Sequence, residues 1–277
     1  MAISAAQLAT AIDALDLAGR PVMTHSSLRS FGEPVDGGAD GVLDALLERG
    51  CTVLVPSFTE SHFSMPAPKD RRLERNGIDY DHPYPPPSVP RGWSVDCGLI
   101  DRSMGTLPAT LIARPGAHRG DHPLDSFAAL GPLAAELTAA QSPADVYGPV
   151  RALAERRGTV LLIGVGLDRM TALHLAERQS GRRLFVRWAK TADGRTAPVE
   201  AGSCSDGFPR LTDHLRPLAR TTRVGSSPWT AFPAHEALAT ASATMAADQT
   251  ITHCANTDCE RCRDSIAGGP LGSLPLG

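Results

Sequence analysis

The sequence predicts an α/β fold in which a parallel or mixed sheet is covered by helices, and three observations lead to it. Short apolar segments alternate with helix-like segments along the first part of the chain, which is the order expected of such a sheet. The 277 residues are 42% hydrophobic but only 5% aromatic, so Ala, Leu, Val and Ile must supply most of the core. The 26 glycines and 23 prolines follow no Gly-X-Y period, which excludes collagen and indicates many ordered loops.

The first four elements follow from apolar spacing and from the residues that stop each element. Leu8, Ile12 and Leu15 recur at helical spacing, and Gly19 and Pro21 behind them end that helix. We expect a helix at residues 4–17, a buried strand at 21–25, a second helix at 39–49 and a second buried strand at 52–56.

The regular pattern stops between residues 60 and 95. Prolines and charged residues fill this stretch, so it is not one regular element, and it is longer than an ordinary connection. Its composition leaves two alternatives open. Either the segment is an ordered excursion that covers a site, or it is a disordered surface loop.

The elements in the second half of the chain follow the same reasoning. Three helices carry a proline in their first turn, at 107–113, 132–140 and 149–157. Residues 159–165 are the strongest strand signal, and a helix at 169–178 follows them directly. A strand at 184–188, an irregular helical stretch at 206–218 and an Ala-rich helix at 234–248 complete the prediction. We expect one domain at residues 1–267, with the irregular excursion at 60–95, and a flexible tail at 268–277.

Charge and hydropathy exclude several classes of partner. The formal net charge is −3, so the overall balance does not favour binding to nucleic acid or to an anionic membrane. Apolar runs are far shorter than the roughly 20 residues that span a bilayer, and the first residues lack the pattern of a signal peptide. We therefore expect a cytoplasmic protein.

The strongest candidate site lies directly behind the strand at 159–165. Asp168, Thr171, His174 and Glu177 recur every three residues, so on one helix they partly share a face, and His174 and Glu177 can touch. A carboxylate beside an imidazole holds its tautomer and raises its basicity, as a general base requires. The carboxyl end of a buried strand is also where α/β sheets bind ligands. The alternative is a solvated pair on a surface helix.

Two other segments carry polar groups that could bind a ligand or take part in catalysis. Residues 24–32 follow a strand and offer hydroxyls, backbone amides and Arg29, which suit phosphate or amide groups, although a plain solvated loop remains the alternative. His122 stands four residues before Ser126, and a His and a Ser are two of the three residues of a Ser hydrolase triad. The nucleophile motif Gly-x-Ser-x-Gly is missing, however, so a hydrogen-bonded structural turn is favoured.

Four soft metal ligands crowd the end of the chain. His253, Cys254, Cys259 and Cys262 lie within ten residues, whereas zinc sites usually take a second pair of ligands about 12 or more residues from the first. We therefore expect thiols without a metal, with a structural zinc site as the alternative. No disulfide framework is expected among the six cysteines.

Four motifs together resemble a known family in their order and spacing. The motifs are Thr-His-Ser-Ser-Leu at 24–28, Ser-Met-Gly-Thr-Leu-Pro at 103–108, Arg119 with His-Pro-Leu-Asp-Ser-Phe at 122–127, and the segment 164–177. The chain thus resembles the aminoglycoside 3-N-acetyltransferase family, also called the antibiotic N-acetyltransferase family, from about Ala5 to Cys262. The resemblance implies a three-layer α/β/α arrangement around a mixed sheet. It also makes the cysteine cluster look like a family feature rather than a special metal site.

The resemblance implies acetyl transfer from acetyl-coenzyme A to the 3-amino group of an aminoglycoside, which confers resistance. In that reaction His174 is the general base, Glu177 or Asp168 orients it, and His122 shapes the site with a catalytic part left open. Thr171 offers a hydroxyl for the thioester oxygen. The residues that match the coenzyme-binding stretches are Ser26, Ser27, Leu28, Arg29, Phe31, Gly32, Ser103, Met104, Gly105 and Leu107.

The chemistry of the substrate agrees with these roles. An aminoglycoside amine is an ammonium at neutral pH, so a base must remove a proton before the nitrogen attacks a thioester. A polycation should be met by carboxylates, and we expect Glu60, Asp79 and Asp96 to bind it. Three alternatives remain: a solvated acidic loop, the same fold acting on another amine, or a non-catalytic module that binds a coenzyme or zinc. Monomer and homodimer both remain open.

Overall fold

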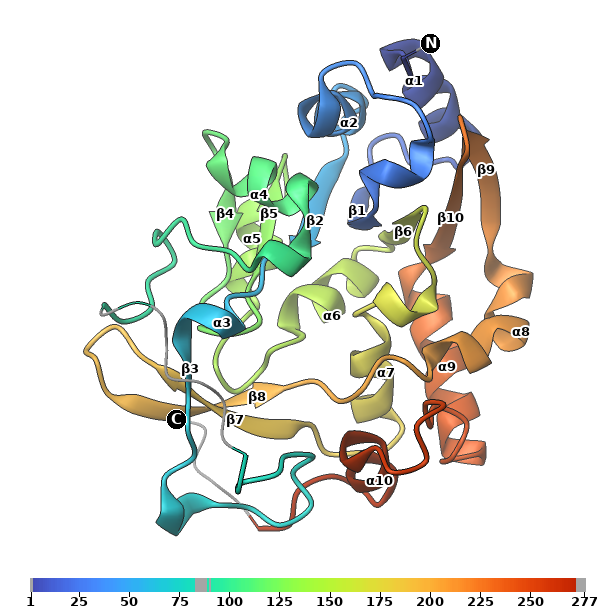
Figure 1. Ribbon diagram of the computed structural model, residues 1–277. Coiled ribbons are helices and arrows are strands. Elements are labelled where there is room, and N and C mark those ends of the chain that lie inside the picture. The colour runs from blue at the N-terminus through green and yellow to red at the C-terminus, as the bar shows by residue number, and fades with distance from the viewer. Residues whose placement is uncertain (1, 83–88, 90, 273–277) are drawn as a thin grey trace.

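A mixed sheet runs through the centre of the structure (Figure 1). The computed structural model describes residues 2–82, 89 and 91–272, and in this part of the chain seven strands pair in the order β4-β5-β2-β1-β6-β10-β9. The central strands β1 (Pro21–Ser26), β2 (Thr52–Pro56) and β6 (Thr159–Ile163) are parallel. The outer strands are antiparallel to their neighbours: β4 (His118–Arg119), β5 (Phe127–Leu130), β9 (Arg220–Val224) and β10 (Ser227–Pro233).

The three central strands are buried along nearly their whole length, as their continuous apolar runs predict. The outer strands β5, β9 and β10 were not predicted. The strand β9 lies at the edge of the sheet and carries polar residues, so it has no apolar run that would reveal a strand. The strand β10 contains two prolines, which in a sequence indicate a loop rather than a strand. Neighbouring strands, rather than local propensity, determine these elements.

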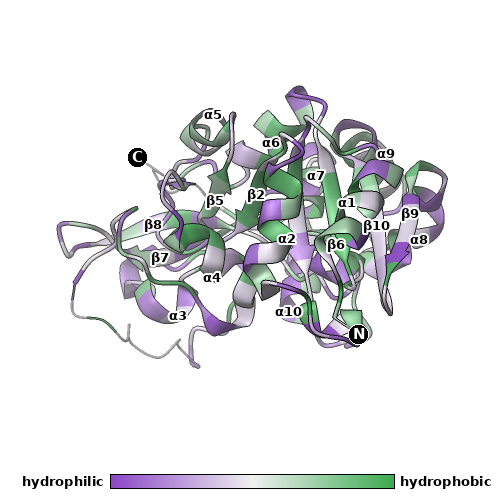
Figure 2. Ribbon diagram, turned by 90° about the horizontal axis from the view of Figure 1, so that it is seen from above, coloured by the Kyte–Doolittle hydropathy of each residue, from purple (hydrophilic) through white to green (hydrophobic). Residues whose placement is uncertain are grey.

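Helices cover both faces of the sheet. One layer holds α1 (Ala5–Ala14), α2 (Gly38–Leu47) and α4 (Thr106–Ala113), which share an apolar core with that face. The other layer holds α5 (Ala134–Ala139), α6 (Gly148–Glu155), α7 (Leu173–Gln179) and α9 (Ala234–Ala247). Figure 2, seen from above, shows the apolar strands between these two layers. The predicted three-layer α/β/α arrangement is confirmed.

The helix predicted at 169–178 begins later than expected. A short 3-10 turn covers Leu167–Arg169, and Met170 then adopts a ψ of 77°, which breaks the helical path before α7 starts at Leu173. Asp168 and Thr171 therefore do not share a helix with His174. The prediction of one continuous helical face was wrong in this respect, because the chain must first turn away from the end of β6.

A second, smaller sheet lies at one end of the molecule (Figure 1). The strands β3 (Ser64–Met65), β7 (Phe185–Lys190) and β8 (Thr196–Ala201) pair antiparallel in this order. The short helix α3 (Glu60–Phe63) follows β2 and leads into β3. Phe63, Trp93 and Leu124 pack into a small core beside this sheet. The sequence predicted β7 but not β8.

The described part of the excursion is ordered. The side-chain amide of Asn76 accepts from Val186 N at 2.8 Å and donates to Val186 O at 2.9 Å, so it pairs like an added strand residue with β7. Trp93 N donates to Lys190 O at 3.1 Å. Residues 83–88 and 90, which include most of the clustered prolines, lie outside the described residues.

The last elements close the layer around α7. The irregular stretch after β8 contains α8 (Thr212–Leu215), and the Ala-rich helix α9 forms as predicted. The helix α10 (Glu260–Ile266) follows. Of the segment predicted as a flexible tail, residues 268–272 are described, and Arg183 donates to the carbonyls of Pro270 and Gly272 at 2.6 Å each. No described helix is long and apolar enough to cross a membrane.

Candidate active site

His174 and Glu177 form a buried pair on α7. The ring Nδ1 of His174 lies 2.7 Å from Glu177 Oε2, and the two residues are 7% and 1% exposed. Their separation of three residues brings both side chains to one side of the helix, as the sequence predicted. The remaining ring nitrogen, Nε2, is the atom left to exchange a proton with a ligand.

Three further groups hold the Glu177 carboxylate. Ser203 donates to Oε2 at 2.6 Å, while Arg182 and Ser265 donate to Oε1 at 2.8 and 3.3 Å. Burial alone would raise the pKa of Glu177, but the bonds from His174 and Ser203 and the charge of Arg182 outweigh burial and lower it. Glu177 is therefore an anion that fixes the orientation of the imidazole.

Aromatic rings and a glycine confine the imidazole. The ring of Tyr147 stacks on His174 at 5.7 Å with an interplanar angle of 20°, and Phe208 contacts it at 4.8 Å. A Cβ at Gly202 would lie 2.3 Å from the Tyr147 hydroxyl and 3.0 Å from the imidazole Cδ2. Only glycine leaves room for the ring at this position.

Several carboxylates surround the Tyr147 ring and thus the histidine. Burial raises the pKa of the Tyr147 hydroxyl, and the negative charges of Asp125, Glu177, Glu200 and Glu60 raise it further. Asp125 is 3% exposed. Burial, followed by the charge of Glu60 and a hydrogen bond with it, raises the pKa of Asp125 well above its usual range. Carboxyl groups thus lie close together here, and the raised pKa of Asp125 reflects the cost of ionising it beside Glu60. A cationic ligand would reduce that cost.

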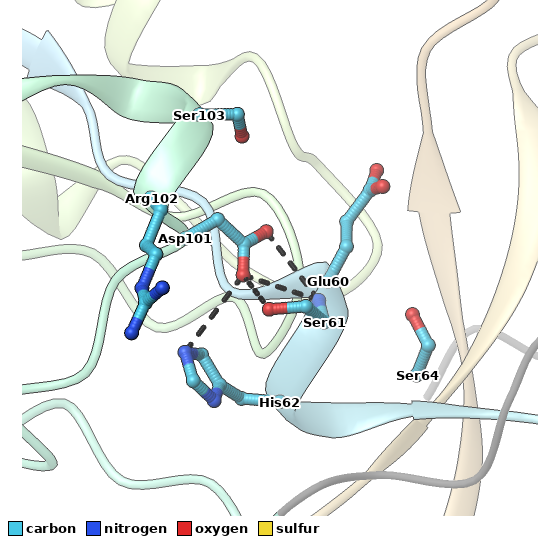
Figure 3. Close-up of a pocket in the computed structure, with 7 residues that line it drawn as sticks. All are labelled: Glu60, Ser61, His62, Ser64, Asp101, Arg102 and Ser103. Carbon is cyan, nitrogen blue, oxygen red and sulfur yellow. Dashed lines mark hydrogen bonds and ion pairs between the residues drawn. The ribbon is translucent and has the colours of Figure 1, made fainter.

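One of these carboxylates, Glu60, lines a cavity of about 540 Å³. Residues from α3, from the start of β3 and from the loop before α4 line it: Glu60, Ser61, His62, Ser64, Asp101, Arg102 and Ser103 (Figure 3). Asp101 is 8% exposed and accepts hydrogen bonds from both the backbone N and the hydroxyl of Ser61, and its Oδ1 lies 3.9 Å from His62 Nε2. Figure 3 shows the Asp101 side chain between the two segments that form the cavity wall.

The sheet brings the candidate segments to one edge. Because β1, β2 and β6 are parallel, their carboxyl ends meet, and the chain behind each one carries a candidate segment. The loop after β1 begins at Ser27, whose N donates to Ile163 O at 2.9 Å, and Glu60 follows β2. The segment that leads to His174 follows β6. The sequence predicted these three positions separately, and the sheet order makes them neighbours.

The residues that match coenzyme-binding stretches fall into three groups by exposure: exposed, buried and partly buried. Arg29, Ser103 and Gly105 are exposed. In contrast, Phe31 and Leu107 are 0% and 1% exposed and belong to the core beneath α2 and α4, where Phe31 packs edge-on against Trp229. The side chains of these two residues are therefore not free to contact a ligand. The others, Ser26, Ser27, Leu28, Met104 and Thr171, are partly buried, and Gly32 is exposed.

The structure separates the other acidic candidates from His174. Asp168 pairs with Arg169 at 3.3 Å and has a side chain that is 38% exposed, so Glu177, and not Asp168, contacts the imidazole. Asp79 pairs with His82 and lines a different surface hollow near α10. Asp96 is exposed, and its backbone N bonds to Ser94 Oγ. Of the three predicted substrate carboxylates, Glu60 alone lines the cavity described above.

His122 has a structural environment. Its Nδ1 accepts from the backbone N of Asp125 at 2.8 Å, and Nε2 donates to Glu200 O at 2.9 Å. The hydroxyl of Ser126 instead donates to Ser57 O and accepts from Arg119. Because backbone groups occupy both ring nitrogens, His122 cannot act as the base for Ser126, which argues against a serine hydrolase.

The burial of His122 predicts a pH-dependent stability. Burial lowers the pKa of His122 to about 3, against 6.5 in a model compound. Between these pH values the unfolded chain binds one proton more than the folded chain, so the free energy of unfolding falls as the pH falls, by about 1.4 kcal/mol per pH unit for this group. Urea unfolding measured between pH 7 and 5 should show a smaller slope for His122→Gln. His214→Gln, at an exposed position of α8, is the control, and an equal slope in both variants would contradict this account.

Several important residues had no signal in the sequence. Tyr147 begins α6, Ser203 follows β8, and Arg182 follows α7, and they meet only around Glu177 and His174. Asp125 stood within a predicted motif but was not recognised as an acidic neighbour of Glu60. Only an alignment of related chains, or the structure, could have connected these positions.

Comparisons with known proteins place the fold and the family. A family model described as aminoglycoside 3-N-acetyltransferase matches residues 23–246. The chain is 36% identical to aminoglycoside N(3)-acetyltransferase IX of Micromonospora chalcea, over 57% of this chain and 56% of that protein. It is 31% identical to an aminoglycoside N(3)-acetyltransferase III of a Salmonella species, over 68% of this chain and 65% of that protein. These matches thus span less than two thirds of either relative.

A solved structure agrees over a longer stretch. The enzyme AAC-IIIb in its binary complex with CoASH superposes with a TM-score of 0.70 at 25% identity, and the match covers 88% of this chain and 97% of that one. The mixed sheet with its helical layers is therefore the fold of known acetyltransferases.

Proposed function

Because the chain belongs to the aminoglycoside 3-N-acetyltransferase family, we propose that it transfers an acetyl group from acetyl-coenzyme A to the 3-amino group of an aminoglycoside. The observation that carries this proposal is the buried His174–Glu177 pair. A cavity lined by Glu60 and Asp101 is the second feature, and Glu60 influences both Asp125 and Tyr147, whose ring stacks on His174. A base and an anionic surface are the two features that a reaction on a polycationic amine requires.

In the proposed reaction His174 Nε2 accepts a proton from the substrate ammonium. The free amine nitrogen then attacks the thioester carbonyl carbon, an N–C bond forms, and the C–S bond breaks to release the coenzyme thiolate. The nitrogen loses a second proton to leave the amide, and the thiolate takes up that proton. Glu177 stabilises the imidazolium that forms on the way. Backbone N–H groups at the sheet edge, or the hydroxyl of Thr171 or Ser103, would bind the developing oxyanion.

In this proposal the two substrates bind to different parts of the site, the coenzyme mainly along the loop after β1 and the aminoglycoside beside α3. We propose that coenzyme A lies along residues 26–32 and 103–105, where the exposed Arg29 offers a guanidinium to its phosphates. The complex of AAC-IIIb with CoASH supports a coenzyme site on this fold. The aminoglycoside would lie against Glu60, Asp101 and Asp125, near His174. An intracellular co-substrate is also in accord with a cytoplasmic location.

The proposed function is tested by following thiol release from acetyl-coenzyme A over a panel of aminoglycosides. Drugs with a free 3-amino group should release thiol and gain one acetyl group by mass spectrometry, and drugs without that amine should not. Equal rates for both kinds of drug would place the acetyl group on another amine. If no aminoglycoside releases thiol, another amine is the substrate and the proposed substrate class is wrong.

The cavity carboxylates are expected to determine the affinity for the cation. Replacing Asp101 by Asn or Glu60 by Gln should raise KM for the aminoglycoside about 10-fold while kcat changes little, since one charge-assisted contact contributes about 1.5 kcal/mol. Asp79→Asn and Asp96→Asn are matched controls, because the structure places neither carboxylate in this cavity. Initial rates at varied drug concentration provide the measurement. A KM that rises for the controls and not for the cavity variants would reverse the assignment.

A further inference from the structure

Four cysteines from two distant segments converge beside α10. Cys204 lies in the loop after β8, whereas Cys254, Cys259 and Cys262 lie just before α10 and in its first turn. One ligand atom from each, the Sγ, lies within 4.8 Å of all the others. Cys254 and Cys262 are buried, and Cys204 and Cys259 are half-buried. The sequence showed only the local part of this cluster, so its argument from local spacing against a metal no longer holds.

The geometry fits a tetrahedral ion. Zinc binds thiolate sulfur at about 2.3 Å, which places the four sulfurs of a tetrahedral site about 3.8 Å apart. Sulfurs that already lie within 4.8 Å need only a small contraction. The backbone N of Cys254 donates to Cys262 Sγ at 3.3 Å, and such N–H bonds support a metal-bound thiolate. His253 is not part of the cluster, since its Nδ1 lies 3.0 Å from the backbone carbonyl of Cys254.

We propose that Cys204, Cys254, Cys259 and Cys262 bind one zinc ion. Four thiolates saturate a tetrahedral ion, so the site is structural and has no open position for substrate. Binding replaces the thiol protons, which leave to solvent, and involves no change of oxidation state. The ion joins the segment after β8 to α10.

This junction supports the candidate active site. Ser203 directly precedes Cys204, and Ser265 lies one turn beyond Cys262 on α10, and both serines donate to Glu177. Gly202, against the His174 ring, belongs to the same segment. The zinc ion would therefore hold two of the four groups that position the Glu177 carboxylate. This effect on catalysis rests on the proposed function, whereas the occupancy of the site does not.

The first test is the metal content of the full-length protein purified without chelator. Elemental analysis should find about one zinc per chain. Cys204→Ser and Cys259→Ser, at the two half-buried positions, should each lose most of it. Cys51→Ser is the matched control. Cys51 is buried, does not belong to the cluster and donates to Leu17 O, so this variant should retain the ion. Zinc that remains in Cys204→Ser and Cys259→Ser, or iron in place of zinc, would overturn the assignment.

A second test does not depend on activity, and its first part uses only the unmodified protein. Cobalt exchanged into the unmodified protein should give the thiolate charge-transfer and d–d absorption of a tetrahedral sulfur site. A chelator at 37 °C should lower Tm of the unmodified protein and of Cys51→Ser, but not of Cys204→Ser. The absence of cobalt absorption, or an intact mass that has lost two hydrogens per disulfide, would show that the cysteines hold no metal.

Discussion

His174→Asn is expected to lower kcat by about 10²- to 10⁴-fold with little change in KM for either substrate, since this is the usual contribution of a positioned general base. Asparagine keeps a donor close to Glu177 but has no basic nitrogen. The imidazole is confined by Tyr147, Phe208 and Gly202, so no other described residue can take its place without moving the segment around it. Initial rates of thiol release at saturating substrates provide the measurement.

The pH dependence of this variant separates a base from a merely structural residue. Without His174, only amine that has already lost its proton can react, and this fraction rises about tenfold per pH unit below the pKa of the amine. The remaining rate of His174→Asn should therefore rise steeply with pH while Tm stays close to that of the unmodified protein. Turnover within about threefold of the unmodified protein would exclude His174 as the base.

Glu177→Gln is expected to have the second-largest effect, in both rate and stability. The amide cannot stabilise an imidazolium as the carboxylate does, so kcat should fall about 10²-fold with KM nearly unchanged. The variant also leaves the Arg182 guanidinium, whose side chain is 4% exposed, without its buried anion. An uncompensated buried charge costs about 3 kcal/mol, which urea unfolding would detect.

A double variant distinguishes these two effects. In Glu177→Gln combined with Arg182→Gln, both charges of this buried pair are removed, so most of the lost stability should return. The rate should stay low, because the carboxylate beside His174 is still missing. Recovery of both rate and stability would mean that Glu177 acts only through the stability of the fold.

Much of the fold could be predicted from local patterns. The apolar runs of β1, β2 and β6, and the helical spacing in α1 and α9, predicted those elements within a few residues. The pair His174 and Glu177 could also be predicted, because residues three apart on a helix are neighbours wherever the helix lies. The edge strand β9 and the pair β7 and β8 depend on cross-strand partners, and only the first strand of that pair had an apolar signal of its own.

The surroundings of the catalytic candidates required the structure. Asp125 and Glu60 lie 65 residues apart in the chain and meet because β2 and β5 are adjacent strands. Conversely, Asp168 stands closer in sequence to His174 than Tyr147 does, yet the break at Met170 points it toward Arg169 and exposes it. Spacing along the chain was therefore a reliable guide within one helix and a poor one across a turn.

The sequence by itself determined an α/β protein, the contact between His174 and Glu177 on α7 and, through four ordered motifs, its family resemblance. Those features depend on interactions between residues that are close in the chain, and apolar periodicity records such interactions directly. Only the tertiary structure decided that Cys204 joins Cys254, Cys259 and Cys262, and that Ser203 and Ser265 meet at Glu177. The path of the chain between distant segments follows from the order of strands and the packing of whole layers, and no local pattern encodes it.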